Sequence, residues 1–273
     1  MDAKEGLKRL TAWFYEYVDQ FVSRDPCIQQ NIDLKTRHTQ RVCEAIRDIG
    51  ATLNLSQEDL CTAEVTGWLH DIGRFEQYTR YGTFMDHRSE DHAALGVRVI
   101  RESRILERMD VFDAKLILKV VGAHNRAGLP AEKDARTLLF LRLLRDADKV
   151  DIWHVVTSYY RDSGKKRNHA LELDLPDLPR ISDPVYDGLM KGRLVNMVDL
   201  KTVNDFKLLQ MGWVYDVNFL RTFQIVRERG YLEAIRDALS VGSERAAHVY
   251  RRARSYVERR CQESGVSGVS IRI

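Results

Sequence analysis

A histidine and an aspartate stand side by side where a helical pattern ends, in the stretch GWLHDIGRF over residues 67–75. Burying His70 and Asp71 costs free energy unless a partner compensates for the lost hydration. A divalent metal ion would compensate both, because imidazole nitrogen and carboxylate oxygen are common ligands of such ions. The pair therefore predicts a metal site.

Other polar residues lie on the apolar faces of segments that read as helices. In each case apolar residues recur three and four positions away, so the polar side chain faces the same side as they do. These residues are His38, His92, His124 and Asp148. Two buried carboxylates would need separate cationic partners. Metal ions would satisfy all six groups together, which is the simpler interpretation.

Each residue taken alone has an ordinary structural interpretation. A single histidine on an apolar face is more often a hydrogen-bonded core residue than a ligand, and Asp148 could pair with Arg145 or Arg142. In the stretch RDADKVD, helical phase also allows Asp146 or Asp151 in place of Asp148. The remaining histidines lack such a context and are interpreted as ordinary polar residues: His87, His154, His169 and His248.

Helical periodicity accounts for most of the chain, and no succession of alternating segments predicts a sheet. We expect helices over 7–21, 33–49, 56–70, 89–103, 113–123 and 132–160, and further helices within 185–262. Ser56 is a predicted N-cap, Gly50 is a predicted C-terminal cap, and Gly73 is suited to left-handed backbone after its helix. The small Gly67 should let another backbone approach closely. Residues 161–184, which are basic and then proline-rich, predict a loop excursion, and residues 263–273 a loose tail. The predicted fold class is all-α.

The composition argues against a nucleic-acid-binding, membrane-spanning or secreted protein. The 273 residues carry a net charge of +3, too little to indicate nucleic-acid binding. No apolar run reaches the ~18 residues that cross a bilayer, and the N-terminus lacks the apolar core of a secretory signal. The cysteines are scattered: Cys27, Cys43, Cys61 and Cys261. Scattered cysteines are typical of reduced thiols, so we expect a cytoplasmic protein.

The pattern of these residues resembles that of a known family. His38, the pair His70–Asp71 within LHDIG, and Asp148 within DADK resemble the signature of the HD superfamily of metal-dependent phosphohydrolases. The stretches HDIGRFEQ, YGTF and DHAALG look closest to a bacterial branch of HDIG-type proteins. The resemblance implies an HD-domain helical bundle over residues 1–160, with its core at 30–160. A C-terminal helical extension over 185–262 would pack on this core.

The resemblance also implies a ligand set. His38, His70, Asp71 and Asp148 would bind one divalent ion, and His92 and His124 a second. If Asp71 bridges the ions, they would lie ~3.5–4 Å apart. Phosphodiesterase branches often have two adjacent histidines where this chain has His124–Asn125, which predicts a weaker second site or one completed by water. One or two ions are therefore expected, and the ligands do not distinguish Mn, Mg, Fe, Co, Ni and Zn.

Such a centre suits the displacement of a group at phosphorus, because a bound ion lowers the pKa of water from ~15.7 towards ~7. Phosphate also attracts fixed positive charge. We expect Asp71, Arg74 and Lys149 to act in catalysis, since Arg74 follows the HDIG turn and Lys149 follows Asp148. Weaker candidates for the same contact are Arg80, Arg88 and Arg126.

The expected function is hydrolysis of a small phosphate ester, with a nucleotide as the favoured substrate class. One alternative is an HD-type di-iron oxygenase, and another is a non-catalytic helical module held together by metal. The expected partner is a small phosphorylated substrate, with no membrane and no nucleic acid. The C-terminal helices would either cover the cleft or form a homodimer contact.

Overall fold

The computed structural model describes residues 3–162, 169–240 and 242–263. These residues form helices and loops, and no strand occurs among them, so the predicted all-α class is confirmed. The chain divides into two compact units, Met1–Asp151 and Ile152–Ile273. The boundary between the units falls inside helix α7 (Ala135–Arg161).

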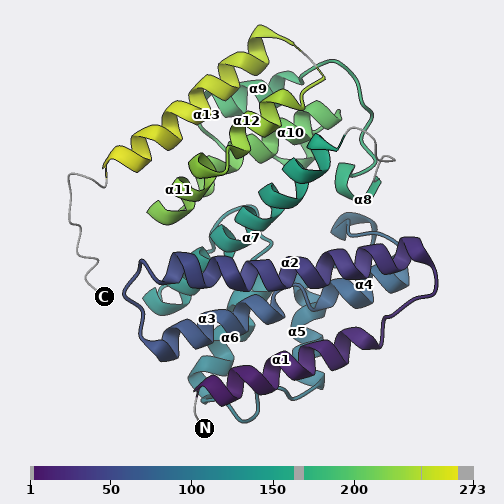
Figure 1. Ribbon diagram of the computed structural model, residues 1–273, viewed down its shortest axis with the longest axis vertical. Coiled ribbons are helices and arrows are strands. Elements are labelled where there is room, and N and C mark those ends of the chain that lie inside the picture. The colour runs from purple at the N-terminus through teal and green to yellow at the C-terminus, as the bar shows by residue number, and fades with distance from the viewer. Residues whose placement is uncertain (1–2, 163–168, 241, 264–273) are drawn as a thin grey trace. The chain divides into compact units, whose positions relative to one another are not determined.

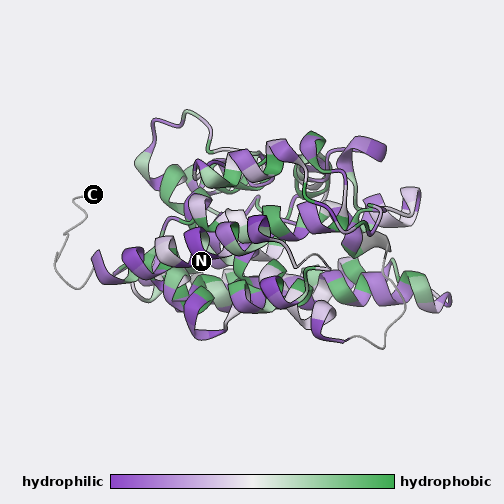
Figure 2. Cartoon of the chain, turned by 90° about the horizontal axis from the view of Figure 1, so that it is seen from above, coloured by the Kyte–Doolittle hydropathy of each residue, from purple (hydrophilic) through white to green (hydrophobic). Residues whose placement is uncertain are grey.

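The first unit carries the candidate metal ligands. Besides the start of α7, its helices are α1 (Ala3–Asp19), α2 (Pro26–Gly50), α3 (Gln57–Leu69), α4 (Gly73–Tyr81), α5 (His92–Glu102) and α6 (Val111–Ala123), with a short 3₁₀ turn η1 (Asp86–Arg88) (Figure 1). Helix α3 packs against α1, α2 and α6, and α5 packs against α4 and α6. Helices α1, α2, α4 and α5 are amphipathic. Figure 2 shows hydrophobic and hydrophilic residues interspersed along the helices of the chain.

The core of this unit is aromatic and aliphatic. Phe14 of α1 is fully buried, and its ring centroid lies 5.0 Å from that of Trp68 and 5.8 Å from that of Phe75. Ile72, which follows Asp71 in the sequence, and Leu95 of α5 are also fully buried. Burial of this kind contributes about 25 cal/mol per Å² of apolar surface, and it fixes the helices that present the polar residues.

The helix starts follow side-chain caps. Ser56 accepts a hydrogen bond from the Asp59 amide, which confirms its predicted N-cap role. Asp25 caps α2 ahead of Pro26, so α2 begins several residues before the predicted start. Asp91 caps α5, and as a result His92 becomes the first residue of that helix. The periodicity did not predict α4, a short helix that begins two residues after Asp71.

Two glycine predictions were wrong. Gly50 is the last residue of α2 and Ala51 is the C-cap in right-handed conformation, while Gly73 begins α4 instead of ending α3. Neither has a positive φ. Gly73 is needed for another reason, because a Cβ there would lie 2.3 Å from the His92 carbonyl oxygen and 2.6 Å from the Gly96 nitrogen. Its missing side chain lets α4 touch the backbone of α5.

A third glycine behaves as predicted. A Cβ on Gly67 would lie 2.6 Å from the Ile46 Cδ1 atom and 3.7 Å from the Cys43 Cα atom. The absence of a side chain therefore allows α3 to approach the backbone of α2 closely, one turn before His70.

The second unit is also helical. Its helices are α8 (His169–Glu172), α9 (Asp183–Met190), α10 (Val203–Gly212), α11 (Leu220–Glu228), α12 (Tyr231–Asp237) and α13 (Glu244–Glu263), with 3₁₀ turns η2 (Met197–Asp199) and η3 (Trp213–Asp216). Helix α13 packs against α9, α10, α11 and α12 (Figure 1). The predicted excursion over 161–184 contains α8, and its residues 163–168 lie outside the described residues, as does the predicted tail from 264 onward. The predicted domain boundaries stay a prediction.

Candidate metal centre

Four buried histidines point into one region of the first unit from four different helices. His38 lies in the middle of α2, and His92 is the first residue of α5. His70 and His124 are the C-cap residues of α3 and α6. Since α3 ends at Leu69 and His70 is its C-cap, the next residue, Asp71, lies in the turn between α3 and α4. The helix ends thus bring together residues that are far apart in the sequence.

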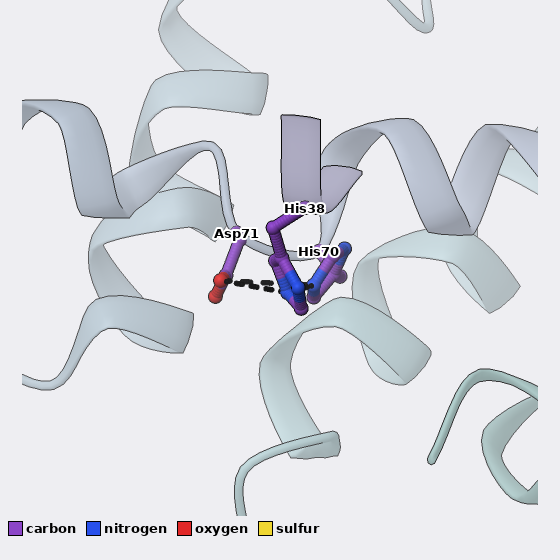
Figure 3. A group of neighbouring side chains, drawn as sticks. All are labelled: His38, His70 and Asp71. Atoms are coloured by element: carbon purple, nitrogen blue, oxygen red, sulfur yellow. Dashed lines mark hydrogen bonds and ion pairs between the residues drawn. The ribbon is translucent and has the colours of Figure 1, made fainter. Parts of the chain in front are cut away.

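The first group of ligand atoms is formed by His38, His70 and Asp71, whose side chains converge in Figure 3. The two Nε2 atoms of His38 and His70 lie 3.2 Å apart. Asp71 Oδ2 lies 3.4 Å from His38 Nε2 and 3.7 Å from His70 Nε2. Three ligand atoms this close together, and all buried, could hold one metal ion.

Asp148 of α7 joins this group. Its Oδ1 atom lies 3.2 Å from His38 Nε2 and 3.9 Å from His70 Nε2, and its side chain is 21% exposed. Asp151, one helical turn later, lies on the other edge of the His38 ring, where its Oδ2 atom is 2.7 Å from Nδ1. The alternative Asp146 is fully buried. Of the three acids, Asp148 is the one that faces both Nε2 atoms.

The second group is formed by Asp71, His92 and His124. The Nε2 atoms of His92 and His124 lie 3.1 Å apart. Asp71 Oδ1 lies 3.4 Å from His92 Nε2 and 3.8 Å from His124 Nε2. One carboxylate therefore has each of its two oxygen atoms directed at a different pair of imidazoles.

The opposite ring nitrogens are all engaged by the protein. His70 Nδ1 lies 2.7 Å from the Gly67 carbonyl oxygen, and His124 Nδ1 lies 2.7 Å from the Val121 carbonyl oxygen. A carbonyl oxygen can only accept, so both Nδ1 atoms carry the proton. His38 Nδ1 faces Asp151, and His92 Nδ1 lies 2.7 Å from Asp86 Oδ2. Such partners fix the tautomer and orientation of a metal-binding histidine.

This arrangement fits a cation between the Nε2 atoms. A neutral imidazole with a protonated Nδ1 presents only a lone pair at Nε2. In the second group two such lone pairs face each other at 3.1 Å in a buried position. Facing acceptors are unfavourable unless a proton or a cation lies between them. The donor set of imidazole nitrogen and carboxylate oxygen suits divalent transition metals.

Burial sets the protonation of these rings. Burial lowers the pKa of His70 and of His92 to about 4, so both are neutral near pH 7. Burial and the charge of Lys35 also lower the pKa of His38, but its hydrogen bonds to Asp148, Asp151 and Asp71 outweigh them and raise it to about 10. In the metal-free chain His38 is therefore an imidazolium, whose Nε2 proton must leave when a metal ion binds there.

Two basic side chains flank Asp71. Lys35 Nζ lies 2.7 Å from Asp71 Oδ2, and Arg74 Nε lies 3.4 Å from Asp71 Oδ1. Burial raises the pKa of Asp71, yet Lys35, His70 and Arg74 outweigh it and hold that pKa well below its usual range. Asp71 is thus an ionised carboxylate, available to two cations.

Asp86 connects Arg74 to the second group. Arg74 Nη1 donates to Asp86 Oδ1 at 3.0 Å and to Gln77 Oε1 at 2.9 Å, and Gln77 Nε2 also donates to Asp86 Oδ1. Asn125 Nδ2 donates to Asp86 Oδ2 at 3.3 Å and to Asp91 Oδ1 at 2.9 Å. Asn125, which stands where phosphodiesterase branches often have a second histidine, therefore contacts Asp86, the carboxylate that orients His92.

The predicted basic residues differ in their placement. Arg74 lies beside Asp71, whereas Lys149 is buried on α7 with Nζ 3.4 Å from the Arg145 carbonyl oxygen. Arg80 is ion-paired with Glu76 on the same helix. Arg88 and Arg126 are exposed. The catalytic role of each stays a prediction.

Two residues of the centre, Lys35 and Asp86, were not predicted from the sequence. Lys35 lies three residues before His38, so helical spacing alone would have placed it on the same face of α2. Asp86 lies six residues before His92 in a 3₁₀ turn, and periodicity gave no signal for it. Only the fold brings its carboxylate to His92.

Comparison with known proteins agrees with this geometry. Residues 36–153 match the family model of the HD domain, a range that includes His38, His70, Asp71, His92, His124 and Asp148. Neither a curated protein nor a solved structure matches the chain. Among the described residues no helix has both the length and the apolar character needed to cross a bilayer. Residues 36–153 therefore form an HD domain, the type found in the HD superfamily of metal-dependent phosphohydrolases.

Proposed function

We propose that this chain is a metal-dependent phosphohydrolase that acts on a small phosphate ester, with nucleotides as the favoured substrate class. The observation that carries the proposal is the position of Asp71, whose two oxygens face two separate pairs of imidazole Nε2 atoms. This is the arrangement expected of a carboxylate shared by two ions. Paired ions can stabilise both the attacking and the leaving oxygen of an in-line displacement at phosphorus.

When bound, divalent ions would supply an activated water and stabilise negative charge on phosphorus oxygens. The chain itself would hold His38, His70, Asp71 and Asp148 at one ion, and Asp71, His92 and His124 at the other. Asp151 and Asp86 orient two of these rings through their Nδ1 atoms. The site is thus oriented before any ligand arrives, which limits the reorganisation that catalysis would require.

Positive charge for the phosphate comes from residues beside Asp71. Lys35 Nζ lies 5.3 Å and Arg74 Cζ 5.9 Å from the centroid of the Phe84 ring, so both charges lie over one aromatic surface. Arg74 Nε is buried, and no described group forms a hydrogen bond with it. These two side chains would bind the substrate phosphate once cations have taken over the charge of Asp71. Lys149 is a third candidate for this role.

The test is metal analysis of the protein as purified, followed by a screen of phosphate esters under anaerobic conditions with and without chelator. We expect phosphate release that chelator abolishes and Mn²⁺ or Mg²⁺ restores. Asp71→Asn should lose this activity while His87→Gln, a change at an exposed histidine, should keep it. A metal-loaded chain with no hydrolysis of any phosphate ester would overturn the proposal.

Parallel assays, with the metal-loaded chain in air and with a His70 variant, separate the alternatives. Imidazole and carboxylate ligands also suit iron, so a visible absorption band together with oxygen uptake would favour the di-iron oxygenase. A non-catalytic module predicts that His70→Ala lowers stability and changes the turnover of no substrate.

A further inference from the structure

A second concentration of positive charge lies in the second unit, on residues that the metal centre does not use. Helix α13, the turn η3 and the loop after α9 enclose a pocket of about 470 Å³. Three arginines of α13 line it: Arg251, Arg252 and Arg259. The rest of the lining consists of Gly192, Tyr215, Ser255 and Tyr256.

The arginines of the pocket are poorly neutralised. Within the described part of the chain, neither Arg251 nor Arg252 has a carboxylate within ion-pair distance. Arg259 is paired with Glu263 at 3.6 Å, at the end of the helix. By contrast, Arg254 on the same helix pairs with Glu233 and lies outside the pocket. The pocket therefore has an excess of positive charge, which an anion would balance.

The walls suit a ligand with an organic part. The rings of Tyr215 and Tyr256 meet edge to face, with centroids 5.1 Å apart. The Tyr215 hydroxyl is buried beside Arg252, but the two do not have the geometry of a hydrogen bond, and no other described group bonds to it. A buried hydroxyl without a partner is costly, so a ligand atom that binds it would be favoured.

A left-handed turn brings the chain to this pocket. Gly192 has a φ of +67°, a conformation that side chains other than glycine rarely adopt. A Cβ at this position would lie 3.7 Å from Arg252 Nη2 and 3.9 Å from the Tyr215 ring. The turn after α9 therefore closes one side of the pocket with backbone, next to the guanidinium of Arg252.

We propose that this pocket binds an organic phosphate of about nucleotide size, with its phosphates on Arg251 and Arg252 and its organic part against Tyr215 and Tyr256. Arginine is suited to phosphate because its planar group can donate two parallel hydrogen bonds. The volume falls within the ~300–1,000 Å³ of small-molecule sites and exceeds what inorganic phosphate needs. The inference does not depend on the hydrolase activity.

The experiment is calorimetric titration of the full, chelator-treated chain with ATP and separately with inorganic tripolyphosphate. We expect ATP to bind more tightly than tripolyphosphate, and Arg252→Glu and Arg251→Glu each to weaken ATP binding by about tenfold or more. The matched control is Arg254→Glu, which makes the same charge change on the same helix outside the pocket. Arg252→Gln provides a milder variant should the charge reversal unfold the protein.

A second control separates this pocket from the metal centre. Lys35→Met removes a positive charge beside Asp71, so ATP bound at the metal centre would be lost in this variant, whereas ATP bound at the pocket would remain. Four results would overturn the proposal: no ATP binding, equal binding of tripolyphosphate, an equal loss in Arg254→Glu, or ATP binding that Lys35→Met abolishes and Arg252→Glu leaves intact. The hydrolase proposal could fail in its own screen while this site binds ATP, so the two failures are distinguishable.

Discussion

His38 and Asp151 meet at 2.7 Å, between Nδ1 and Oδ2, and this contact leaves His38 Nε2 directed at His70 and Asp148. Arg41 binds the same carboxylate through its guanidinium, so Asp151 is itself held in place. The contact joins α2 to α7 across more than a hundred residues of sequence. We therefore propose Asp151 as a positioning residue and Asp148 as the metal ligand on α7.

Asp151→Asn should weaken metal binding at the first group by about 10–100-fold, because the ring of His38 loses its charged partner. Competition with a chromophoric chelator measures this change. Asp33→Asn, which alters an acid on the exposed face of α2, serves as the control. An unchanged affinity would show that Asp151 does not orient His38.

Asp86→Asn should affect the other ion. Asp86 accepts from His92 Nδ1, and no residue of the first group contacts it in the described structure. We expect the number of tightly bound ions per chain to fall from two to one, with the first retained. Titration with Mn²⁺ followed by electron paramagnetic resonance counts them. The opposite pattern, with loss of the first ion, would contradict the assignment of Asp86.

Helical periodicity predicted the histidines of this centre but not what surrounds them. His38, His92 and His124 could be found because three-and-four spacing places them among residues that must be buried. The choice between Asp148 and Asp151 could not be made from that spacing, since one helical turn puts both on the same face of α7. The position of the His38 ring between them distinguishes Asp148, the proposed metal ligand, from Asp151, which orients the ring.

The role of Gly73 was missed for a similar reason. A glycine after a helix predicts left-handed backbone, and nothing in the local sequence reports that α5 passes 2.3 Å from where its Cβ would be. Close approach between helices depends on the tertiary fold. Asp86 lies beyond local prediction in the same way, because a 3₁₀ turn has no extended periodicity.

Gly73→Ala should therefore disturb both the fold and the second group. The new methyl would meet the carbonyl oxygen of His92, so α5 must shift and carry the ring with it. We expect a loss of about 1–3 kcal/mol in the free energy of unfolding, and weaker binding of the second ion. Urea denaturation measures the first effect. Gly6→Ala, where the methyl meets nothing within 4 Å, should instead stabilise α1 by about 0.5–1 kcal/mol.

The metal-free chain should be most stable near pH 6.5–7. In the folded chain the pKa values of His70 and His92 are lowered to about 4. As pH falls from 6.5, these two histidines therefore become protonated in the unfolded chain before they do in the folded chain. Stability should be lost between pH 6.5 and 4, by about 1 kcal/mol per pH unit for each histidine. The contribution of His38 to stability depends on pH in the opposite direction. With its pKa raised to about 10, its contribution is complete below pH 6.5 and is lost as pH rises towards 10.

Denaturation midpoints of the chelator-treated chain between pH 5 and 10 test both the loss of stability below pH 6.5, the acid limb, and the loss towards pH 10, the alkaline limb. His92→Asn should flatten the acid limb, and His87→Gln should leave it unchanged. An acid limb that is equally steep in His92→Asn would assign the loss to other groups.

Lys35→Met should have opposite effects on metal affinity and on turnover. Lys35 lies 2.7 Å from the carboxylate that faces both groups, so its removal takes away a charge that repels divalent ions. We expect Mn²⁺ to bind more tightly, while hydrolysis of a phosphate ester slows because the substrate phosphate loses a cationic partner. Lys35→Arg keeps the charge and should change metal affinity little. A variant that loses metal affinity and turnover together would mean that Lys35 acts only by holding Asp71 in place.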